Sequence, residues 1–275
     1  MNDCMDSFDY YIETESFHCK FAKGKPAVNG SEFHEYDEIV MFLGGNVNFA
    51  SKEIQTALQP RDVVWISKEQ FHQFTVSKTE PYTRCIVAIK GSSPLASVMR
   101  ETVSGVSISR QSETESNLFN KIINTITGSL SRCEQAILLG ALITQLVFER
   151  KQYGETSTET ASAPSSLVSR AISYIDDRFD QNLTVSKIAC ALYVSESNLS
   201  HRFREQLNMS VYRYLTEKRL SVVRQYVSSG YSIGHAAILC GFKDYGSFYR
   251  ICKSHYGVSP SEFLRTQAAN LQITD

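Results

Sequence analysis

The chain has 275 residues, more than one small domain needs, and this length suggests about two domains. Hydrophobic residues make up 42% and charged residues 21%, so the composition excludes a wholly disordered, collagen-like or heptad-repeat protein. The net charge is only −1, but residues 183–265 contain 11 basic and 5 acidic residues. This local surplus favours a polyanionic partner, with a solvated charged surface as the alternative.

Neither a membrane span nor a secretory signal is evident. The longest helical candidate, residues 133–148, is interrupted by Glu134, Gln135, Thr144 and Gln145 and falls short of the roughly 18 uninterrupted apolar residues of a span. The first residues, MNDCMDSFDYY, are acidic where a signal would be basic. We therefore expect a cytoplasmic protein without a membrane partner. The seven scattered cysteines, with no CxxC spacing, predict reduced thiols.

Residues 8–90 have the pattern of short strands. Apolar runs at 39–43, 63–66 and 85–89 are continuous, as expected for strands covered on both faces. Turn signals such as Gly44-Gly45 and the sequence QPRD at 59–62 separate them. Short strands at about ten-residue spacing predict a sandwich or a small barrel.

Between residues 93 and 152 the hydrophobic pattern changes to helical spacing. One stripe on the last helix, at about 133–151, either packs on its own barrel or pairs two copies of the chain, and the pattern leaves both open. For pairing, the stripe consists of Ile137, Leu138, Ala141, Leu142, Gln145 and Leu146.

A segment of small polar residues, YGETSTETASAPSS at 153–166, predicts a linker between two domains. The second domain, 167–275, is helical throughout and contains an internal near-duplication. Ala189 matches Ala237 at an offset of 48 residues, and the offset is 49 later on. Those later pairs include Leu199/Phe248, Phe203/Cys252, Arg204/Lys253 and Ser210/Ser259.

Each copy predicts a helix-turn-helix unit, at about 184–206 and 232–256. The small alanine lets two helices cross closely, and apolar residues four apart form the inner face of the second helix. Ser195 is placed as an N-cap, and Asn208 and Gly257 follow the second helices as left-handed C-caps. An ordinary pair of helical hairpins is the alternative interpretation.

Two segments carry a family resemblance. CGFKDYGSFYRICKSHYGVSPSEFLR at 240–265 resembles the signature of AraC/XylS-family transcription regulators, and LSHRFR at 199–204 resembles the first recognition helix of that family. The resemblance covers residues 169–265. The chain departs from the family pattern at Cys252, where phenylalanine is usual, at Tyr193 and Asn208, where glycine is common, and at Gly246.

The resemblance implies that a long helix at about 211–227 joins two recognition helices, which enter major-groove segments roughly 34 Å apart. Arg250 is the strongest candidate for specificity, because a guanidinium binds guanine bidentately. The expected base-reading residues are Ser197, Ser200, His201, Tyr245, Ser247, Tyr249 and Arg250. The expected phosphate contacts are Ser195, Arg204, Lys243 and Lys253.

Residues 32–74 resemble the cupin-like sensor barrels of carbohydrate-type AraC regulators. Metal-dependent barrels of this kind need about three histidines and a carboxylate with HxHxxxE-like spacing, and Tyr36 stands where we expect the second histidine. We therefore predict no metal and no cofactor. The expected effector contacts are His34, Tyr36, Glu38, Trp65 and His72.

Together these patterns predict a two-domain α+β protein and not an enzyme. Residues 1–152 form a cupin-like barrel, at about 8–90, with helices at about 93–152, and the second domain holds the two helix-turn-helix units. The expected function is that of a DNA-binding transcription regulator, usually an activator in this family, which recruits RNA polymerase, forms a homodimer and responds to a small-molecule effector. Control by a protein partner, and a cupin-type metabolite enzyme with a DNA-binding tail, are the alternatives.

Overall fold

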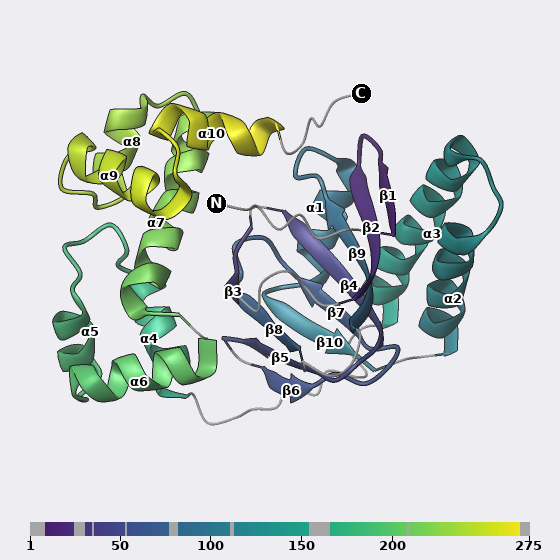
Figure 1. Ribbon diagram of the computed structural model, residues 1–275, viewed down its shortest axis with the longest axis horizontal. Helices are drawn as coiled ribbons and strands as arrows, with labels where there is room; N and C mark the ends of the chain where they lie inside the picture. The colour runs from purple at the N-terminus through teal and green to yellow at the C-terminus, as the bar shows by residue number, and fades with distance from the viewer. Residues whose placement is uncertain are drawn as a thin grey trace. The chain divides into compact units, whose positions relative to one another are not determined.

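The computed structural model of the protein describes residues 9–24, 31–34, 36–52, 54–76, 82–110, 113–153, 166–207 and 209–269. The chain divides into two compact units, Met1–Ser165 and Ser166–Asp275 (Figure 1). The first unit is rich in sheet and the second is helical, which confirms the predicted two-domain α+β architecture. Apart from its two end residues, the predicted linker lies outside the described residues.

The described strands of the first unit form two antiparallel sheets. The larger has the order β1-β2-β9-β4-β7-β10 and the smaller has the order β3-β8-β5-β6. The strands are β1 (Tyr10–Glu13), β2 (Phe17–Gly24), β3 (Ser31–Glu32), β4 (Asp37–Gly44), β5 (Val47–Ser51), β6 (Gln55–Ala57), β7 (Val63–Ile66), β8 (His72–Val76), β9 (Tyr82–Ile89) and β10 (Val106–Ser109). Across the described strands, pairing stays within each sheet, so the expected barrel takes the form of two layers and not of a closed ring.

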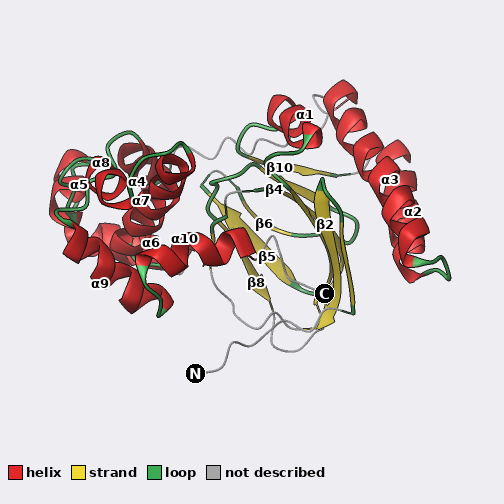
Figure 2. Ribbon diagram, turned by 90° about the horizontal axis from the view of Figure 1, so that it is seen from above, coloured by secondary structure: helices red, strands yellow, loops and turns green. Residues whose placement is uncertain are grey.

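The larger sheet is covered on both faces, as its apolar runs predicted. Val40 and Phe42 of β4 pack inward against Phe49 and Phe74 of the smaller sheet. The alternate residues of the strand, Met41 among them, join a second cluster on the opposite face. Figure 2 shows the two sheets facing each other, with helices outside the larger one. Successive side chains of a strand point to opposite faces, so a strand buried on both sides must be apolar at every position.

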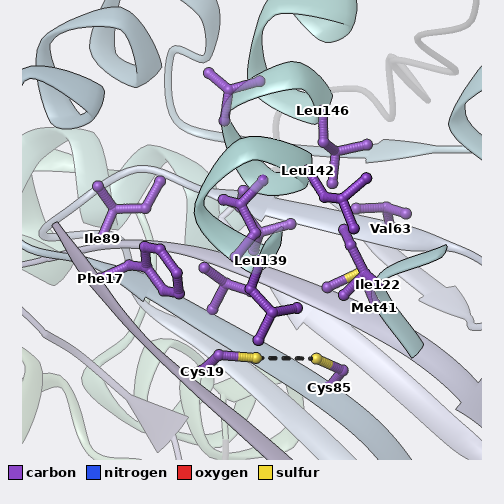
Figure 3. Close-up of a cluster of buried hydrophobic side chains, with 14 of the residues drawn as sticks. Phe17, Cys19, Met41, Val63, Cys85, Ile89, Ile122, Leu139, Leu142 and Leu146 are labelled. Carbon is purple, nitrogen blue, oxygen red and sulfur yellow. Dashed lines mark hydrogen bonds between the residues drawn. The ribbon is translucent and has the colours of Figure 1, made fainter. Parts of the chain in front are cut away.

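Three helices cover the outer face of the larger sheet: α1 (Pro94–Thr102), α2 (Glu113–Thr127) and α3 (Arg132–Tyr153). Figure 3 shows the contact of α2 and α3 with the sheet, where the Sγ atoms of Cys19 and Cys85 lie 3.5 Å apart. The buried face of α3 follows the 3.6-residue period of a helix. It consists of Leu139, Leu142, Ile143, Leu146 and Val147.

This face corrects the predicted pairing stripe of α3. Leu142 and Leu146 belong to the core of their own unit, so neither is available to a second copy. Ile137, by contrast, is 70% exposed, and Leu138 is also exposed. Ala141 and Gln145 lie on the exposed side as well. The predicted stripe therefore combined two faces of one helix.

The second unit consists of seven described helices. They are α4 (Leu167–Asp176), α5 (Val185–Ala191), α6 (Glu196–Leu207), α7 (Val211–Ser228), α8 (Ile233–Leu239), α9 (Tyr245–Tyr256) and α10 (Pro260–Ala269). Helices α5 and α6 form one helix-turn-helix unit, α8 and α9 form the other, and α7 runs between them (Figure 1). The long helix that was expected at about 211–227 is thus confirmed. None of the described helices combines the length and apolar character that crossing a bilayer requires.

A short loop between α4 and α5 contacts α7 and the second helix-turn-helix unit. Arg219 of α7 donates to the carbonyl oxygens of Phe179, at 2.8 Å, and Gln181, at 2.7 Å. From the other side, the turn at Gly241 lies so close to this loop that a Cβ atom on Gly241 would stand 2.6 Å from the Asp180 carbonyl oxygen. We call residues 179–181 the bridging loop. Its contacts reach α7 and the turn between α8 and α9.

Candidate nucleic-acid interface and buried polar cluster

The two helix-turn-helix units share one turn geometry. The amide of Val194 donates to the carbonyl of Ala189 at 3.0 Å, and in the second unit Phe242 donates to Ala237 at 3.1 Å. Both alanines are fully buried, which confirms their predicted place at the helix crossing. In each unit, the residue before the donor of this hydrogen bond has a positive φ, which is 59° at Tyr193 and 83° at Gly241. The tyrosine thus adopts a left-handed conformation that suits glycine better.

Helix α6 has one buried and one exposed face. Leu199, Phe203 and Leu207 are buried against the rest of the unit. The Ser195 hydroxyl accepts from the Asn198 amide at 3.2 Å, which confirms the predicted N-cap. Of the expected base-reading residues, Ser197 and His201 are exposed and Ser200 is half-buried. This face is polar and accessible, as a recognition helix requires.

Helix α9 repeats this division. Phe248 and Cys252 are fully buried, while Tyr245 and Tyr249 are 46% and 40% exposed. Arg250 is exposed, and its Nη2 donates to the half-buried Ser247 hydroxyl at 3.2 Å. The helix ends at Gly257, whose φ of 72° confirms the predicted left-handed C-cap. Asn208, the corresponding residue after α6, lies outside the described residues.

Asp244 begins α9, a capping role that the sequence analysis missed although an acidic residue just before a helix is a common N-cap. Its Oδ1 accepts from the Ser247 amide at 2.6 Å. This backbone hydrogen bond holds the pKa of the Asp244 carboxyl below its ordinary value. The carboxylate therefore occupies the electropositive N-terminus of the helix.

The four expected phosphate contacts are all exposed. Arg204 lies in the last turn of α6, and Lys243 lies just before α9. Lys253 is placed near the C-terminus of α9, with its Nζ 3.5 Å from the Gly257 carbonyl oxygen. The Ser195 hydroxyl is engaged in the N-cap of α6.

Helix α7 lies between the two helix-turn-helix units. The helix has 18 residues and is therefore about 27 Å long. Helix α6 contacts α7, and α8, which carries α9 behind it, packs along it. This length is of the same order as the roughly 34 Å between successive major-groove segments on one face of a duplex.

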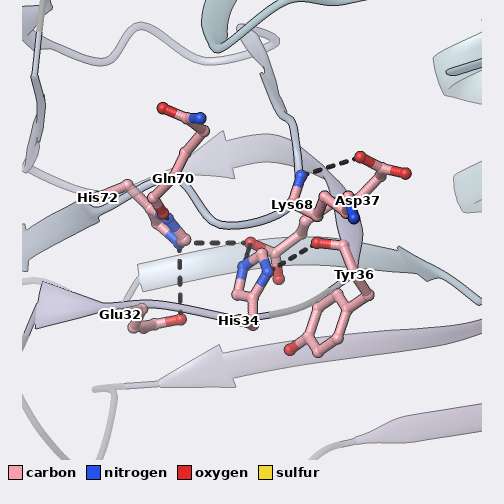
Figure 4. Close-up of polar contacts among 8 residues, drawn as sticks. Glu32, His34, Tyr36, Asp37, Lys68, Gln70 and His72 are labelled. Carbon is pink, nitrogen blue, oxygen red and sulfur yellow. Dashed lines mark hydrogen bonds and ion pairs between the residues drawn. The ribbon is translucent and has the colours of Figure 1, made fainter. Parts of the chain in front are cut away.

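In the first unit the structure brings three of the expected effector residues together in a buried cluster (Figure 4). His34 Nε2 lies 3.1 Å from Glu38 Oε2, and His72 Nε2 lies 3.4 Å from the same oxygen. Glu32 approaches from β3, with its Oε2 3.8 Å from His72 Nε2. Glu38 belongs to the larger sheet, whereas Glu32 and His72 belong to the smaller one.

Backbone carbonyls orient both imidazoles. His34 Nδ1 lies 2.8 Å from the Tyr36 carbonyl oxygen, and His72 Nδ1 lies 3.1 Å from that of Gln70. A carbonyl oxygen only accepts, so each Nδ1 carries the proton and each Nε2 faces the carboxylates. Tyr36 contributes its ring as well, which stacks on His34 with centroids 4.0 Å apart.

Mutual attraction outweighs burial in this cluster. Burial would raise the pKa of Glu38, but His34 and His72 hold that pKa well below its usual range. Burial acts against the charged form of His72, yet Glu32 and Glu38 raise its pKa to about 10. The cluster thus favours positive charge at His72 and negative charge at Glu38.

Trp65 does not join this cluster. It belongs to the core on the helix-covered face of the larger sheet, where its Nε1 donates to the Ser109 hydroxyl at 2.9 Å. Glu32, in turn, was missed by the sequence analysis. The spacing Glu32-x-His34-x-x-x-Glu38 is that of the expected metal motif with glutamate in the place of the first histidine. A search that admitted carboxylates at every ligand position would have found it.

Three comparisons relate the chain to known proteins. A family model described as a helix-turn-helix domain matches residues 188–266. The arabinose operon regulatory protein of Escherichia coli K12 is 33% identical over 151 residues, which are 54% of this chain and 50% of that protein. The raffinose operon transcriptional regulatory protein RafR of Pediococcus pentosaceus is 28% identical over 132 residues, 47% of this chain and 48% of that one.

The xylose operon regulatory protein of Haemophilus influenzae is 27% identical over 112 residues, 40% of this chain and 29% of that protein. The chain therefore spans half or less of the length of these curated relatives, which are regulators and not enzymes. Among solved structures, ToxT from Vibrio cholerae with a bound unsaturated fatty acid is 16% identical with a TM-score of 0.40, over 91% of this chain and 95% of that one.

Proposed function

We propose that the chain is a transcription regulator of the AraC/XylS type, which binds specific DNA sequences and activates transcription under the control of its first unit. The observation that carries the proposal is the pair of helix-turn-helix units with one turn geometry, whose second helices each bury one face and expose a polar one. In this proposal α6 and α9 enter adjacent major-groove segments, and the chain acts in the cytoplasm by recruiting RNA polymerase.

The proposal is tested by letting the full-length chain select its binding sites from a pool of DNA duplexes of random sequence. We expect an enriched motif with two blocks whose centres lie about 10–10.5 base pairs apart, because in this proposal the two recognition helices enter major-groove segments one turn of DNA apart. Enrichment of a single short block, or of none, would contradict binding by two helices. Transcription from a promoter carrying the selected site then distinguishes activation from repression.

The expected phosphate contacts predict a measurable salt effect. Arg204→Ala and Lys243→Ala should weaken binding to the selected site and to a scrambled duplex by the same factor. Each should also reduce the slope of log affinity against log salt concentration by about 0.9, because one fewer counterion is released. Fluorescence anisotropy at several salt concentrations measures both quantities, and a loss confined to the selected site would reject the phosphate role.

We propose that two copies of the chain pair through the exposed side of α3, which carries Ile137 and Leu138. A cavity of about 360 Å³ adjoins this side, lined by Ile137, Gly140 and Thr144 of α3 and by residues of the β1–β2 turn. Pairing of two chains on two half-sites would raise affinity through effective concentration, without new contacts to DNA.

A charge at the centre of this surface should separate the chains. Ile137→Glu is expected to convert a dimer into a monomer, because a carboxylate would be desolvated at an apolar interface. The matched control is Asn120→Glu, which places the same charge at an exposed position of α2. Light scattering measures the mass, and a dimer that persists in Ile137→Glu would contradict this interface.

We propose that the first unit, a cupin-like pair of sheets, receives the regulatory signal at the cluster of His34, Tyr36, Glu38 and His72. The signal is a small-molecule effector or, in the second candidate mechanism, a protein partner. An effector changes DNA affinity only through its different affinity for the two states of the protein. A flat titration of DNA affinity across candidate metabolites would favour the protein partner.

A further inference from the structure

The buried cluster of the first unit has the donor set and the geometry of a metal site. Two imidazole Nε2 atoms and two carboxylates converge, and the ligand atoms of His34, Glu38 and His72 all lie within 4.8 Å of one another. Metal–nitrogen and metal–oxygen bonds of about 2.1 Å place neighbouring ligand atoms roughly 3.0–3.5 Å apart. The measured separations from Glu38 Oε2, 3.1 Å and 3.4 Å, fall in this range.

The orientation of the histidines supports the same conclusion. In both residues Nδ1 is used by a backbone carbonyl, which is the arrangement that orients histidine ligands in metal proteins. Each Nε2 then faces a carboxylate oxygen of Glu38, and a divalent cation bound between these atoms would take the place of the proton that otherwise joins them. His72 Nε2 makes no hydrogen bond of good geometry although His72 is fully buried.

We propose that His34, Glu38 and His72 bind one divalent first-row transition-metal ion, with Glu32 as a fourth ligand. Two imidazoles with carboxylates suit Zn²⁺, Fe²⁺, Mn²⁺ or Co²⁺, whereas Ca²⁺ and Mg²⁺ prefer all-oxygen sites. The three buried ligands resemble the two-histidine, one-carboxylate arrangement that leaves coordination positions open. Glu32 has a 54% exposed side chain and stands on the accessible side of the site.

The ion would connect the two sheets. Glu38 comes from β4 of the larger sheet, His72 and Glu32 come from β8 and β3 of the smaller sheet, and His34 lies between β3 and β4. A ligand that binds the folded chain and not the unfolded chain stabilises the folded state by mass action. A metal that joins the two sheets should therefore raise the melting temperature of the first unit. The inference rests on this cluster alone and needs no DNA binding.

The experiment uses the full-length chain without a histidine tag. Elemental analysis after dialysis against Zn²⁺ should give one ion per chain, and titration with Co²⁺ should produce visible absorption bands that saturate at one equivalent. Glu38→Gln and His72→Gln are each expected to lower the Co²⁺ affinity by more than about 100-fold, because even outer-shell partners cost about 10–100-fold. Glu32→Gln, which alters a half-exposed side chain, should weaken binding less and leave folding intact.

His18→Gln is the matched control, because His18 is a buried histidine of the same unit that stands outside the ligand set. The His18→Gln variant should still bind one ion per chain, and the metal should still raise its melting temperature. The proposal is overturned if the wild-type chain takes up no stoichiometric ion, or if Glu38→Gln, His72→Gln and Glu32→Gln all retain it. In either case the cluster is an ion-pair network only, and the proposed regulation of transcription is unaffected.

Discussion

Replacing Gly241 by alanine is expected to destabilise the second unit by about 2–4 kcal/mol. The added Cβ would stand 2.6 Å from the Asp180 carbonyl oxygen, and the φ of 83° is one that side chains with a Cβ rarely adopt. The bridging loop would have to move away from the turn between α8 and α9. Urea denaturation followed by circular dichroism measures the loss, and DNA affinity should fall with it.

The first helix-turn-helix unit supplies the control. Tyr193 occupies the equivalent turn position with a φ of 59° and has a 93% exposed side chain. Tyr193→Gly should therefore relieve strain without loss of packing, with a change of less than about 1 kcal/mol in the stabilising direction. A loss of less than about 0.5 kcal/mol in Gly241→Ala would show that the bridging loop yields readily, and would end its assigned role.

Arg250→Ala is expected to abolish discrimination at one base pair of the selected site and leave the other positions unchanged. The side chain is exposed on the outer face of α9, beside Ser247, where a guanidinium can bind O6 and N7 of guanine. The lost discrimination should be about 1–3 kcal/mol at that position. Binding to all single-base variants of the site measures this effect position by position.

Lys253→Ala is the matched control, since Lys253 is exposed on the same helix and is expected to contact phosphate. It should weaken binding to every variant by one common factor and leave the base preference intact. An equal loss from both substitutions on cognate and scrambled DNA would reject the division between base-reading and phosphate-contacting residues.

The helical unit was largely predictable because its local signals agree. Buried alanines, apolar residues four apart and a glycine C-cap all indicate the same repeated unit, and the resemblance to a known motif adds the expected function. Helix α3 was harder, because apolar residues such as Ile137 and Leu142 occur on two of its faces and only tertiary packing decides which one is buried.

The polar cluster could be predicted only in part. Its histidines stand out by residue type, but which residues meet depends on how β3, β4 and β8 lie across the two sheets, and this is a long-range property. Trp65 shows the same limit. The strand β7 is apolar at every position, so its sequence does not say which face a side chain takes.

The bridging loop has a consequence for the operator that the protein can accept. Residues 179–181 lie just before α5 and contact both α7 and the turn between α8 and α9, so we expect the two reading helices to move as a pair that keeps a fixed phase on the double helix. One extra base pair between the two contacted DNA sequences would rotate the second sequence by about a tenth of a turn about the DNA axis. Helix α9 could then no longer reach it. Among natural sites, the identity of the bases between the two contacted sequences should therefore vary freely, but the number of these bases should not vary.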